Sequence, residues 1–382
     1  MRANPVSNER GIALAVAVFA LVVIGALVAA TFFSGRLEQQ TGQNTVYATQ
    51  AAEAAEAALS QAIGATTGPE MYEMAVGGDF ADLPAPSIGG YVTGQPSMRR
   101  LTNSLWLLQA VGRRQNGVGT ELARHSLAQL IRANQANISV KAGLTALGRV
   151  VVTGNSTVSG DDAMPTEWST PPAVDCPPLE DVTGIRYNGL LTQEGSATIK
   201  GDPPRDKDGT LTADNMLGGS NFEQLKVLTT LTLTGDISGL APVTVGDPPV
   251  CDISVQSNWG EPLDKAHPCF NYFPVVYHLG DLGISGSGMG QGILLVEGNL
   301  NVQGRIDFYG PVIVTGGVNI RGTGSDDVKF YGGVLAQDIT LDDSKLSGNA
   351  MVAYSSCAIR RAVQGSATPI PLSERSWVQL YN

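Results

Sequence analysis

The chain has 382 residues, which is more than one ordinary domain contains and enough for two or three. Its 43% hydrophobic and 15% charged residues are typical of a globular chain rather than a disordered one, and its 46 glycines show no Gly-X-Y period, which excludes collagen. The net charge of −11 disfavours a general nucleic-acid binder, and three histidines and four cysteines provide few ligands for a metal cluster. The composition therefore favours a protein without enzymatic activity.

The first predicted element is a membrane-spanning helix. From Gly11 to Gly35 the chain has 25 residues without a charge, which reach about 37 Å as a helix, more than a hydrocarbon core of about 30 Å. The run is longer than the apolar region of a secretory signal peptide. Arg2 and Arg10 precede it against the single acid Glu9, so the positive-inside rule keeps this end in the cytoplasm and sends the rest across the membrane.

The helix is predicted to continue beyond the membrane as an amphipathic segment and to end near Gly64, before Gly68-Pro69. Apolar or small residues recur there in steps of 4, 4, 3 and 4, which places them on one face, while Glu53 and Glu56 point away from it. We expect this docking stripe to pack on a neighbouring part of the protein. It consists of Tyr47, Ala51, Ala55, Ala58 and Ala62.

The sequence Glu9-Arg10-Gly11-Ile12-Ala13-Leu14 joins a charged leader ending in glycine to the apolar helix. With the amphipathic continuation, it resembles a type IV prepilin over about the first sixty residues, and it matches the site where prepilin peptidase cleaves after the glycine. The resemblance implies that Ile12 is the mature amino terminus. Val16 is then the fifth mature residue, where major pilins have Glu. PilX-type minor pilins and the large tip pseudopilin of type II secretion share this departure, and the stretch resembles them most closely, which would suit a tip or initiating position.

A small antiparallel sheet is predicted after a loop rich in Gly, Pro and Ser at residues 65–98. SLWLLQAVGRR is expected to be a strand, QNG a turn, and ELARHSLAQLIRANQ a strand or short helix. Residues 98–149 are basic, with only one acid, Glu121; their basic residues are Arg99, Arg100, Arg113, Arg114, Arg124, Arg132, Lys141 and Arg149. They could bind a polyanion, but no aromatic residues interleave with them, so we expect them to pair with acids of the rest of the chain or of a neighbouring subunit. A nucleic-acid partner is disfavoured.

The remaining sequence predicts a parallel β-solenoid. Short β-branched runs begin at Gly292, Gly310, Gly332 and Gly348, at steps of 18, 22 and 16, and stacked coils of this length can bury a shared core. Phe308-Tyr309-Gly310 recurs 22 residues later at Phe330-Tyr331-Gly332, which indicates an internal aromatic stack. The expected fold class is therefore α+β, with a long N-terminal helix (transmembrane, then amphipathic), a small antiparallel sheet and a C-terminal parallel β-solenoid-like domain.

Four parts are expected along the chain: a leader at 1–11, the helix at 12–64, the small head sheet with loops at 65–145, and the solenoid at 146–382 with a Pro- and Asp-rich insert at about 161–225. The last hundred residues, from NYFPVVYHLGDLGI to SERSWVQLY, also resemble an uncharacterised module that follows PilX-type amino termini in some bacterial proteins.

Four cysteines on the far side of the membrane favour disulfides, and three connectivities are open to them. We favour Cys251 with Cys269, and Cys176 with Cys357 by elimination. A zinc site of Cys251, His267, Cys269 and His278 is an alternative, but its spacing matches no paired-ligand signature. His125 and His278 are interpreted as structural.

Two pairs of acids at predicted turns are weak calcium candidates, although solvated turn acids are the commoner case. They are Asp326 with Asp327 and Asp342 with Asp343. No other metal site, no cofactor and no catalytic residue is predicted.

The leading hypothesis is a non-enzymatic minor pilin-like subunit of a type IV pilus or a type II secretion pseudopilus. It would reside in the inner membrane by a single pass, with the C-terminal domain in the periplasm or in an extracellular pilus. Its expected partners are other pilin or pseudopilin subunits, an inner-membrane assembly platform and prepilin peptidase. One alternative is a membrane-anchored β-helix enzyme acting on polysaccharide, which three converging acids on one solenoid face would favour. Another is a bactofilin-like polymerising scaffold, which requires a cytoplasmic solenoid.

Overall fold

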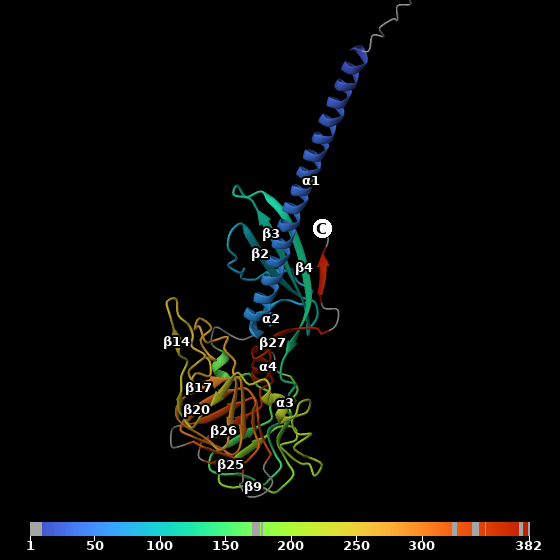
Figure 1. Ribbon diagram of the computed structural model, residues 1–382. Coiled ribbons are helices and arrows are strands. Elements are labelled where there is room, and N and C mark those ends of the chain that lie inside the picture. The colour runs from blue at the N-terminus through green and yellow to red at the C-terminus, as the bar shows by residue number, and fades with distance from the viewer. Residues whose placement is uncertain are drawn as a thin grey trace, which may run out of the picture. The chain divides into compact units, whose positions relative to one another are not determined.

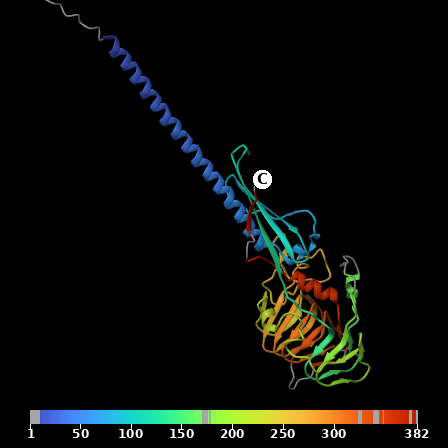
Figure 2. The same ribbon diagram turned by 90° about the vertical axis from the view of Figure 1, so that its right-hand side faces the viewer.

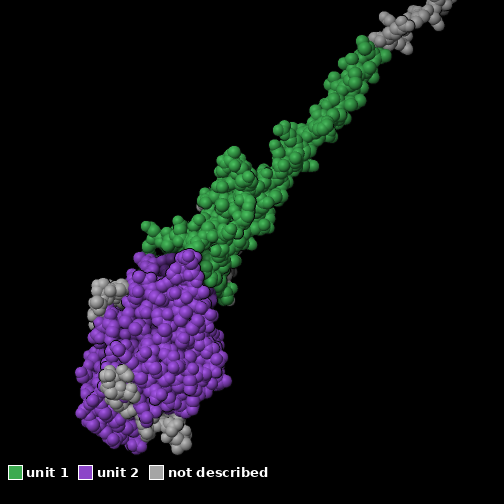
Figure 3. Space-filling model, turned by 90° about the vertical axis from the view of Figure 1, so that its left-hand side faces the viewer, with its two compact units in different colours: residues 1–65, 76–132, 371–382 green, residues 66–75, 133–370 purple. Residues whose placement is uncertain are grey.

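The computed structural model describes residues 10–169, 176, 179–322, 327–337, 344–347, 349–373 and 377–380. The chain forms two compact units (Figure 3), one made of residues 1–65, 76–132 and 371–382 and the other of residues 66–75 and 133–370. The first unit combines a long helix with an antiparallel sheet, and the second is built on parallel strands. The predicted α+β fold class is confirmed.

The helix of the first unit, α1, runs without interruption over Arg10–Ala65 (Figure 1). The segment Ile12–Ala65 is long and apolar enough at its start to cross a membrane, by length and composition. The antiparallel sheet has the spatial order β1 (Ala81–Asp82), β2 (Val92–Arg100), β3 (Leu105–Gln115), β4 (Glu121–Asn134) and β28 (Trp377–Leu380). The sequence ELARHSLAQLIRAN, for which strand and helix were both open, is the strand β4.

The second unit contains a solenoid with parallel strands on three sides. Among the described residues, one sheet has eight strands, in spatial order β11 (Arg205–Lys207), β8 (Thr183–Tyr187), β5 (Ala142–Ala146), β24 (Val334–Ala336), β21 (Val312–Val314), β18 (Ile293–Glu297), β16 (Val275–Leu279) and β12 (Leu231–Leu233). The other sheet runs from β10 (Thr198–Lys200) through β7 (Thr157–Ser159), β26 (Ala350–Ala353), β23 (Val328–Tyr331), β20 (Arg305–Tyr309), β17 (Leu282–Gln291), β19 (Leu300–Gln303), β22 (Val318–Arg321), β25 (Ser344–Ser347) and β6 (Val150–Val152) to β9 (Leu191–Gln193), with β13 (Ile237–Leu240) beside β17.

This second sheet covers two sides because β17 turns a corner. Its first part, Leu282–Ile284, pairs with β19, and its last part, Ser287–Gln291, pairs with β20. Gly286 lies between the two parts with φ +85°, a conformation that favours glycine. The glycines that punctuate the strand runs thus allow the coil to bend.

The remaining elements of the second unit lie outside the two parallel sheets. The helices are α2 (Gly68–Glu73), α3 (Phe222–Lys226), α4 (Ser356–Gly365) and the 3₁₀ turn η1 (Thr166–Ser169). A hairpin is formed by β14 (Thr244–Val245) and β15 (Val250–Cys251). The strand β27 (Thr368–Pro371) belongs to the antiparallel sheet.

The order of the coils in space differs from their order in the chain. The last coil packs on the first, since β24 pairs with β5, β25 with β6 and β26 with β7 (Figure 2). The chain therefore enters the solenoid at β5, inside the stack of coils, and forms β8 to β11 at one end. It then passes through residues 208–230 to β12 at the other end, and the following coils return from there to β5. Residues 183–207, which the sequence placed in an insert, belong to the solenoid.

The solenoid interior is filled by aliphatic residues and three large aromatic ones, Phe308, Phe330 and Trp259. Phe308 and Phe330 are paired in register on β20 and β23, with ring centroids 6.2 Å apart. The expected internal aromatic stack is therefore present. The adjacent pair Tyr309 and Tyr331 faces outward, with ring centroids 5.1 Å apart, and η1 covers it.

The outer face of the eight-stranded sheet has a second apolar layer. Its outward side chains, among them Tyr277, Leu295 and Ile313, pack against the segment that connects the two solenoid ends. That segment contributes Leu211, Met216, Leu217, Phe222 and Leu225. Burial of apolar surface, which contributes about 25 cal/mol of free energy per Å², therefore holds the connecting segment on the sheet.

Candidate functional site

The apolar half of α1 is exposed along its whole length. Residues 12–46 are solvent-exposed on every side, including Ile12, which is 70% exposed, and Phe32, which is 76% exposed. Each exposed Val, Leu, Ile or Phe side chain of this run would gain about 1.5–3 kcal/mol on transfer to an apolar environment. A soluble monomer rarely exposes so large an apolar surface, so this segment requires lipid or another apolar partner.

The predicted processing residues lie at the beginning of this helix. Gly11 and Ile12 belong to the first turn of α1, and Val16 follows one turn later with its side chain exposed. No acidic residue occurs between Ile12 and Gly35. Nothing in the geometry tests cleavage after Gly11, which stays a prediction.

The predicted docking stripe is the buried face of α1. Ala51, Ala55 and Ala58 are 0% exposed and Ala62 is 2% exposed, whereas Glu53 and Glu56 are exposed. Tyr47 is half-buried at the start of the stripe, and the guanidinium carbon of Arg114 lies 5.6 Å from its ring centroid. The stripe packs on β2 and β3. Ala54 and Leu59 are buried beside it and were missing from the sequence-based set.

Two glycines of the sheet allow the helix to approach closely. A Cβ atom on Gly112 of β3 would lie 1.9 Å from the carbonyl oxygen of Ala51, and one on Gly94 of β2 would lie 2.4 Å from that of Ala54. Any side chain at either position would collide with the helix backbone. Sequence reasoning missed both residues, although glycine inside a strand is a recognised signal of close backbone approach.

The arginines of the sheet rest on aromatic rings of the same unit. Arg114 also lies over Tyr91 at 5.5 Å, and Arg100 lies over Trp106 at 5.4 Å. Arg99 lies 6.0 Å from the ring of Phe80, and Arg113 forms a 3.3 Å ion pair with Glu121. The expectation that aromatic residues do not accompany these arginines was therefore wrong. Trp106 lies between Arg100 and Arg113 in the sequence itself, and the other rings come from α1 and from the segment before β2.

The four cysteines form two disulfides in the connectivity favoured from the sequence. Cys251 is bonded to Cys269 with a Cα–Cα distance of 4.8 Å, and Cys176 to Cys357 with a distance of 5.6 Å. The zinc alternative is overturned, since its two cysteines are bonded to each other. The ring of His278 lies instead between the backbone carbonyls of Leu233 and Asp281.

Metal-binding geometry is not found in the described ranges: no three His, Cys, Asp or Glu residues in them could hold a metal ion. Of the calcium candidates, Asp326, Asp342 and Asp343 lie outside the described residues, and Asp327 is half-buried just before β23. His125 lies on β4, where it pairs across the sheet with Gly112.

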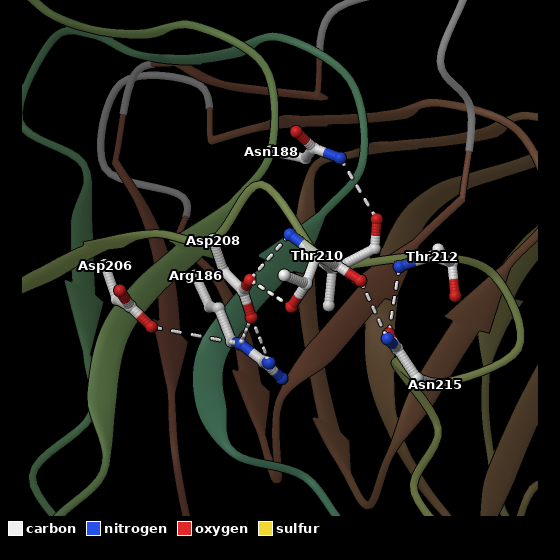
Figure 4. A network of polar contacts seen from close by, with 8 residues as sticks. Arg186, Asn188, Asp206, Asp208, Thr210, Thr212 and Asn215 are labelled. Atoms are coloured by element: carbon white, nitrogen blue, oxygen red, sulfur yellow. Dashed lines mark hydrogen bonds and ion pairs between the residues drawn. The ribbon is translucent and has the colours of Figure 1, made fainter.

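A polar network ties the solenoid to the start of the connecting segment (Figure 4). The guanidinium of Arg186 on β8 pairs with Asp206 at 3.9 Å and also with Asp208. The Oδ1 atom of Asp208 accepts hydrogen bonds from the backbone N–H of Thr210 at 2.8 Å and from its hydroxyl at 2.6 Å. These bonds from Thr210, with that from Arg186, lower the pKa of Asp208 to about 2.

The same network continues to a surface hollow. Asn215 donates to the carbonyl of Thr210 at 2.8 Å and accepts from the backbone N–H of Thr212 at 2.9 Å, and Asn188 donates to the carbonyl of Leu211 at 3.0 Å. A hollow of about 550 Å³ lies beside these residues and is lined partly by Arg149 and Leu190. The polar groups are engaged with one another, so the network holds the chain rather than presenting reactive groups.

Acidic side chains gather on the solenoid side that carries β20 and β23. Glu167 of η1 accepts from the ammonium of Lys329 at 3.1 Å and from the hydroxyl of Tyr331 at 3.1 Å. Burial disfavours ionisation of Glu167, but the hydrogen bonds outweigh it and lower its pKa. Burial raises the pKa of Asp307, which pairs with Lys329 across the strands, and the charges of Glu167 and Asp327 act in the same direction.

Comparisons with known proteins leave the family open. No family model and no curated protein matches the chain. Among solved structures, the competence-associated pilin ComZ from Thermus thermophilus is similar over 87% of this chain and 97% of its own, with 10% sequence identity and a TM-score of 0.26. A TM-score this low carries no argument about family or activity, so the functional inference rests on the residues themselves.

Proposed function

We propose that the chain is a non-enzymatic pilin-like subunit that assembles through α1 and carries the solenoid as its head. The observation that carries this proposal is the division of one continuous helix. Its first half is apolar and exposed on all sides, and its second half is fixed to a sheet through an alanine face. A rigid rod of this kind can lie in a bilayer, and, once extracted, it can bury the same surface only among similar rods.

The finer assignment rests on the start of the sequence. The absence of an acid in the apolar run, with Val16 at the fifth position after the proposed cleavage, supports a minor subunit of the PilX type, placed at the tip or at initiation. A buried carboxylate needs a charged partner, so a subunit that lacks it makes no such contact with a subunit ahead. The proposed location is the inner membrane, with both disulfide-bonded regions outside the cytoplasm.

Processing after Gly11 provides the first test. The Gly11→Val variant, expressed in cells with an active prepilin peptidase, is expected to keep residues 1–11, whereas the wild type begins at Ile12. Gly25→Val is the matched control, because Gly25 lies in the same helix with no atom near its Cβ position. Mass spectrometry of the amino terminus distinguishes the two forms. A shortened Gly11→Val product, or a wild-type protein that retains its leader, would refute the proposal.

The strands at one end of the solenoid disfavour the alternative of a bactofilin-like polymerising scaffold. The strands β10 and β11 there carry the exposed residues Lys200, Arg205 and Lys207, and the prolines Pro203 and Pro204 lie between them. Charged side chains and prolines at a sheet edge discourage pairing with another chain. Resistance of the head to protease added to the periplasm would favour the scaffold and oppose the pilin-like proposal.

One observation favours the second candidate, a polysaccharide-processing enzyme. The charges of Glu167 and Asp327 contribute to raising the pKa of Asp307, after burial as the largest cause, whereas the pKa of Glu167 is lowered. Paired carboxylates of this kind can serve as acid and base. Release of reducing ends from a polysaccharide by the wild type, with loss of that activity in Asp307→Asn, would establish this candidate.

A further inference from the structure

The solenoid has a polar groove on the side formed by β13, β17, β19 and β22. Its volume is about 240 Å³. The polar side chains that line it are Asp236, Ser285, Asn301, Gln303, Asn319 and Arg321. They come from four neighbouring coils of the solenoid, so the groove follows the direction in which the coils are stacked.

The strand register arranges these side chains in rows. Asn301 of β19 pairs with Asn319 of β22, and Gln303 pairs with Arg321 two residues further along the same strands. Gly283 of β17 precedes Asn301 in the first row. Because neighbouring parallel strands lie about 4.8 Å apart, each row presents hydrogen-bonding groups at that regular spacing.

One end of the groove is held in place by a backbone contact. The Oδ1 atom of Asp236 accepts from the N–H of Gly283 at 2.8 Å. A Cβ atom at Gly283 would lie 2.9 Å from the carboxyl carbon of Asp236, so a larger residue there would displace this carboxylate from its present position. The remaining oxygen of Asp236 is available to a ligand without rearrangement.

The amides of the groove lack partners, in contrast to a similar residue close by. Asn299, two residues before Asn301, is bonded on both sides: its N–H and amide nitrogen donate to Asp281 at 2.8 and 3.0 Å, and its amide oxygen accepts from Gly317 at 2.8 Å. Within the described part of the chain, the side chains of Ser285, Asn301, Gln303, Asn319 and Arg321 form no such bonds, and the amide oxygen of Asn319 is buried without a partner. Unpaired polar atoms at such a position cost free energy unless a ligand or water pairs with them.

We propose that this groove binds a neutral saccharide chain lying along the stacking direction of the coils. Hydroxyl groups both donate and accept, as the amides of Asn301, Gln303 and Asn319 do, and the spacing between coils is about the length of one sugar ring. Among the groove-lining residues that the structure describes, the charges of one acid and one arginine offset each other, which disfavours a nucleic acid. The strands β17, β19 and β22 are paired on both edges, so a peptide cannot bind to them by strand addition.

The groove is a binding site rather than a hydrolytic one. Glycoside hydrolysis by the usual mechanism requires two carboxyl groups that flank the bond, and Asp236 is the one acidic residue among the groove-lining residues described here. The inference does not depend on the role of α1, because a head with this groove would bind the saccharide whether or not the chain enters a fibre.

Isothermal titration calorimetry of the full chain tests the proposal. The protein is kept in a polyoxyethylene detergent, which carries no sugar headgroup, and is titrated with cellohexaose, chitohexaose, mannohexaose and the anionic hexamer of galacturonic acid. We expect at least one neutral hexamer to bind with a Kd below about 1 mM. Failure of all three neutral hexamers, or tighter binding of the anionic one, would overturn the proposal.

Two variants locate the site. The double variant Asn301→Ala/Asn319→Ala is expected to weaken binding at least tenfold, and Gln303→Met, which keeps the side-chain length, provides a second reading if the double variant does not fold. Thr232→Ala is the control, since Thr232 is an exposed residue on β12 of the other sheet. If Gln303→Met, or a double variant that folds, binds the saccharide as tightly as the control does, any saccharide binds elsewhere on the protein.

Discussion

Substitution of Gly112 by Ala should weaken the docking of α1 on the sheet. The new Cβ atom would lie 1.9 Å from the carbonyl oxygen of Ala51 and 2.7 Å from the nitrogen of Ala55, whereas ordinary van der Waals contact begins near 3.4 Å. Both obstacles are backbone atoms, so no side-chain rotation removes the clash. The helix must move away from β3 by roughly 1.5 Å, which forfeits much of the dispersion energy across the interface.

The size of the effect follows from the packing of the docking stripe. Inserting a methyl group into a well-packed interface costs about 1–3 kcal/mol. A central value of about 2 kcal/mol corresponds to a roughly 30-fold increase in the population of the undocked helix. Gly94→Ala should act in the same way, since its Cβ would lie 2.4 Å from the carbonyl oxygen of Ala54. The two effects should be less than additive, because either substitution already displaces the same helix.

Hydrogen exchange of the amides of residues 51–62 measures this undocking directly. Exchange there should accelerate about 30-fold in Gly112→Ala, while the amides of the solenoid stay unchanged. Gly42→Ala is the matched control, because Gly42 is exposed in the same helix with no atom within 4 Å of its Cβ position. That change should strengthen the helix by about 1 kcal/mol. Unchanged exchange in Gly112→Ala would refute the conclusion that close approach at this glycine holds the helix.

Two further predictions concern the second unit. The pKa of Asp208 is about 2 in the folded protein against an ordinary value of 3.8, so the stability that its bonds contribute is complete above about pH 4 and is lost as the pH falls through 2. The difference in melting temperature between the wild type and Asp208→Asn should therefore shrink over that range. A difference that stays undiminished at pH 2 would contradict this account. Replacing the cysteines of Cys176–Cys357, which are 181 residues apart, by serine should lower the free energy of unfolding by about 5 kcal/mol. The same change at Cys251–Cys269, which are 18 residues apart, should lower it by about 3 kcal/mol. Urea unfolding measures both values, and a larger loss from the shorter loop would oppose the chain-entropy argument.

Much of the fold could be predicted because its signals are local. The long uncharged run and the stripe from Tyr47 to Ala62 identified α1 and its buried face, since helical periodicity depends only on neighbours in sequence. The repeat of Phe-Tyr-Gly predicted that Phe308 and Phe330 stack in adjacent coils. Both disulfide pairs were also favoured, because four cysteines leave few choices.

Other features depend on residues that are far apart in the chain. The rings beneath Arg99 and Arg114 come from loops and from α1, so no sequence window contains both partners. The groove is formed by residues from four coils, and its unpaired amides are indistinguishable in sequence from the bonded Asn299. Sequence reasoning found neither.

The sequence by itself determined which segments are helix or strand and which of their faces are apolar, because these properties repeat within a few residues. Only the tertiary structure decided that the last coil packs on the first, that residues 183–207 extend the solenoid, and that α1 approaches the sheet at Gly94 and Gly112. The physical reason is that every coil presents the same kind of apolar surface to its neighbours. Local patterning is therefore satisfied by several stacking orders, and the choice among them falls to long-range packing and to the chain connections that it permits.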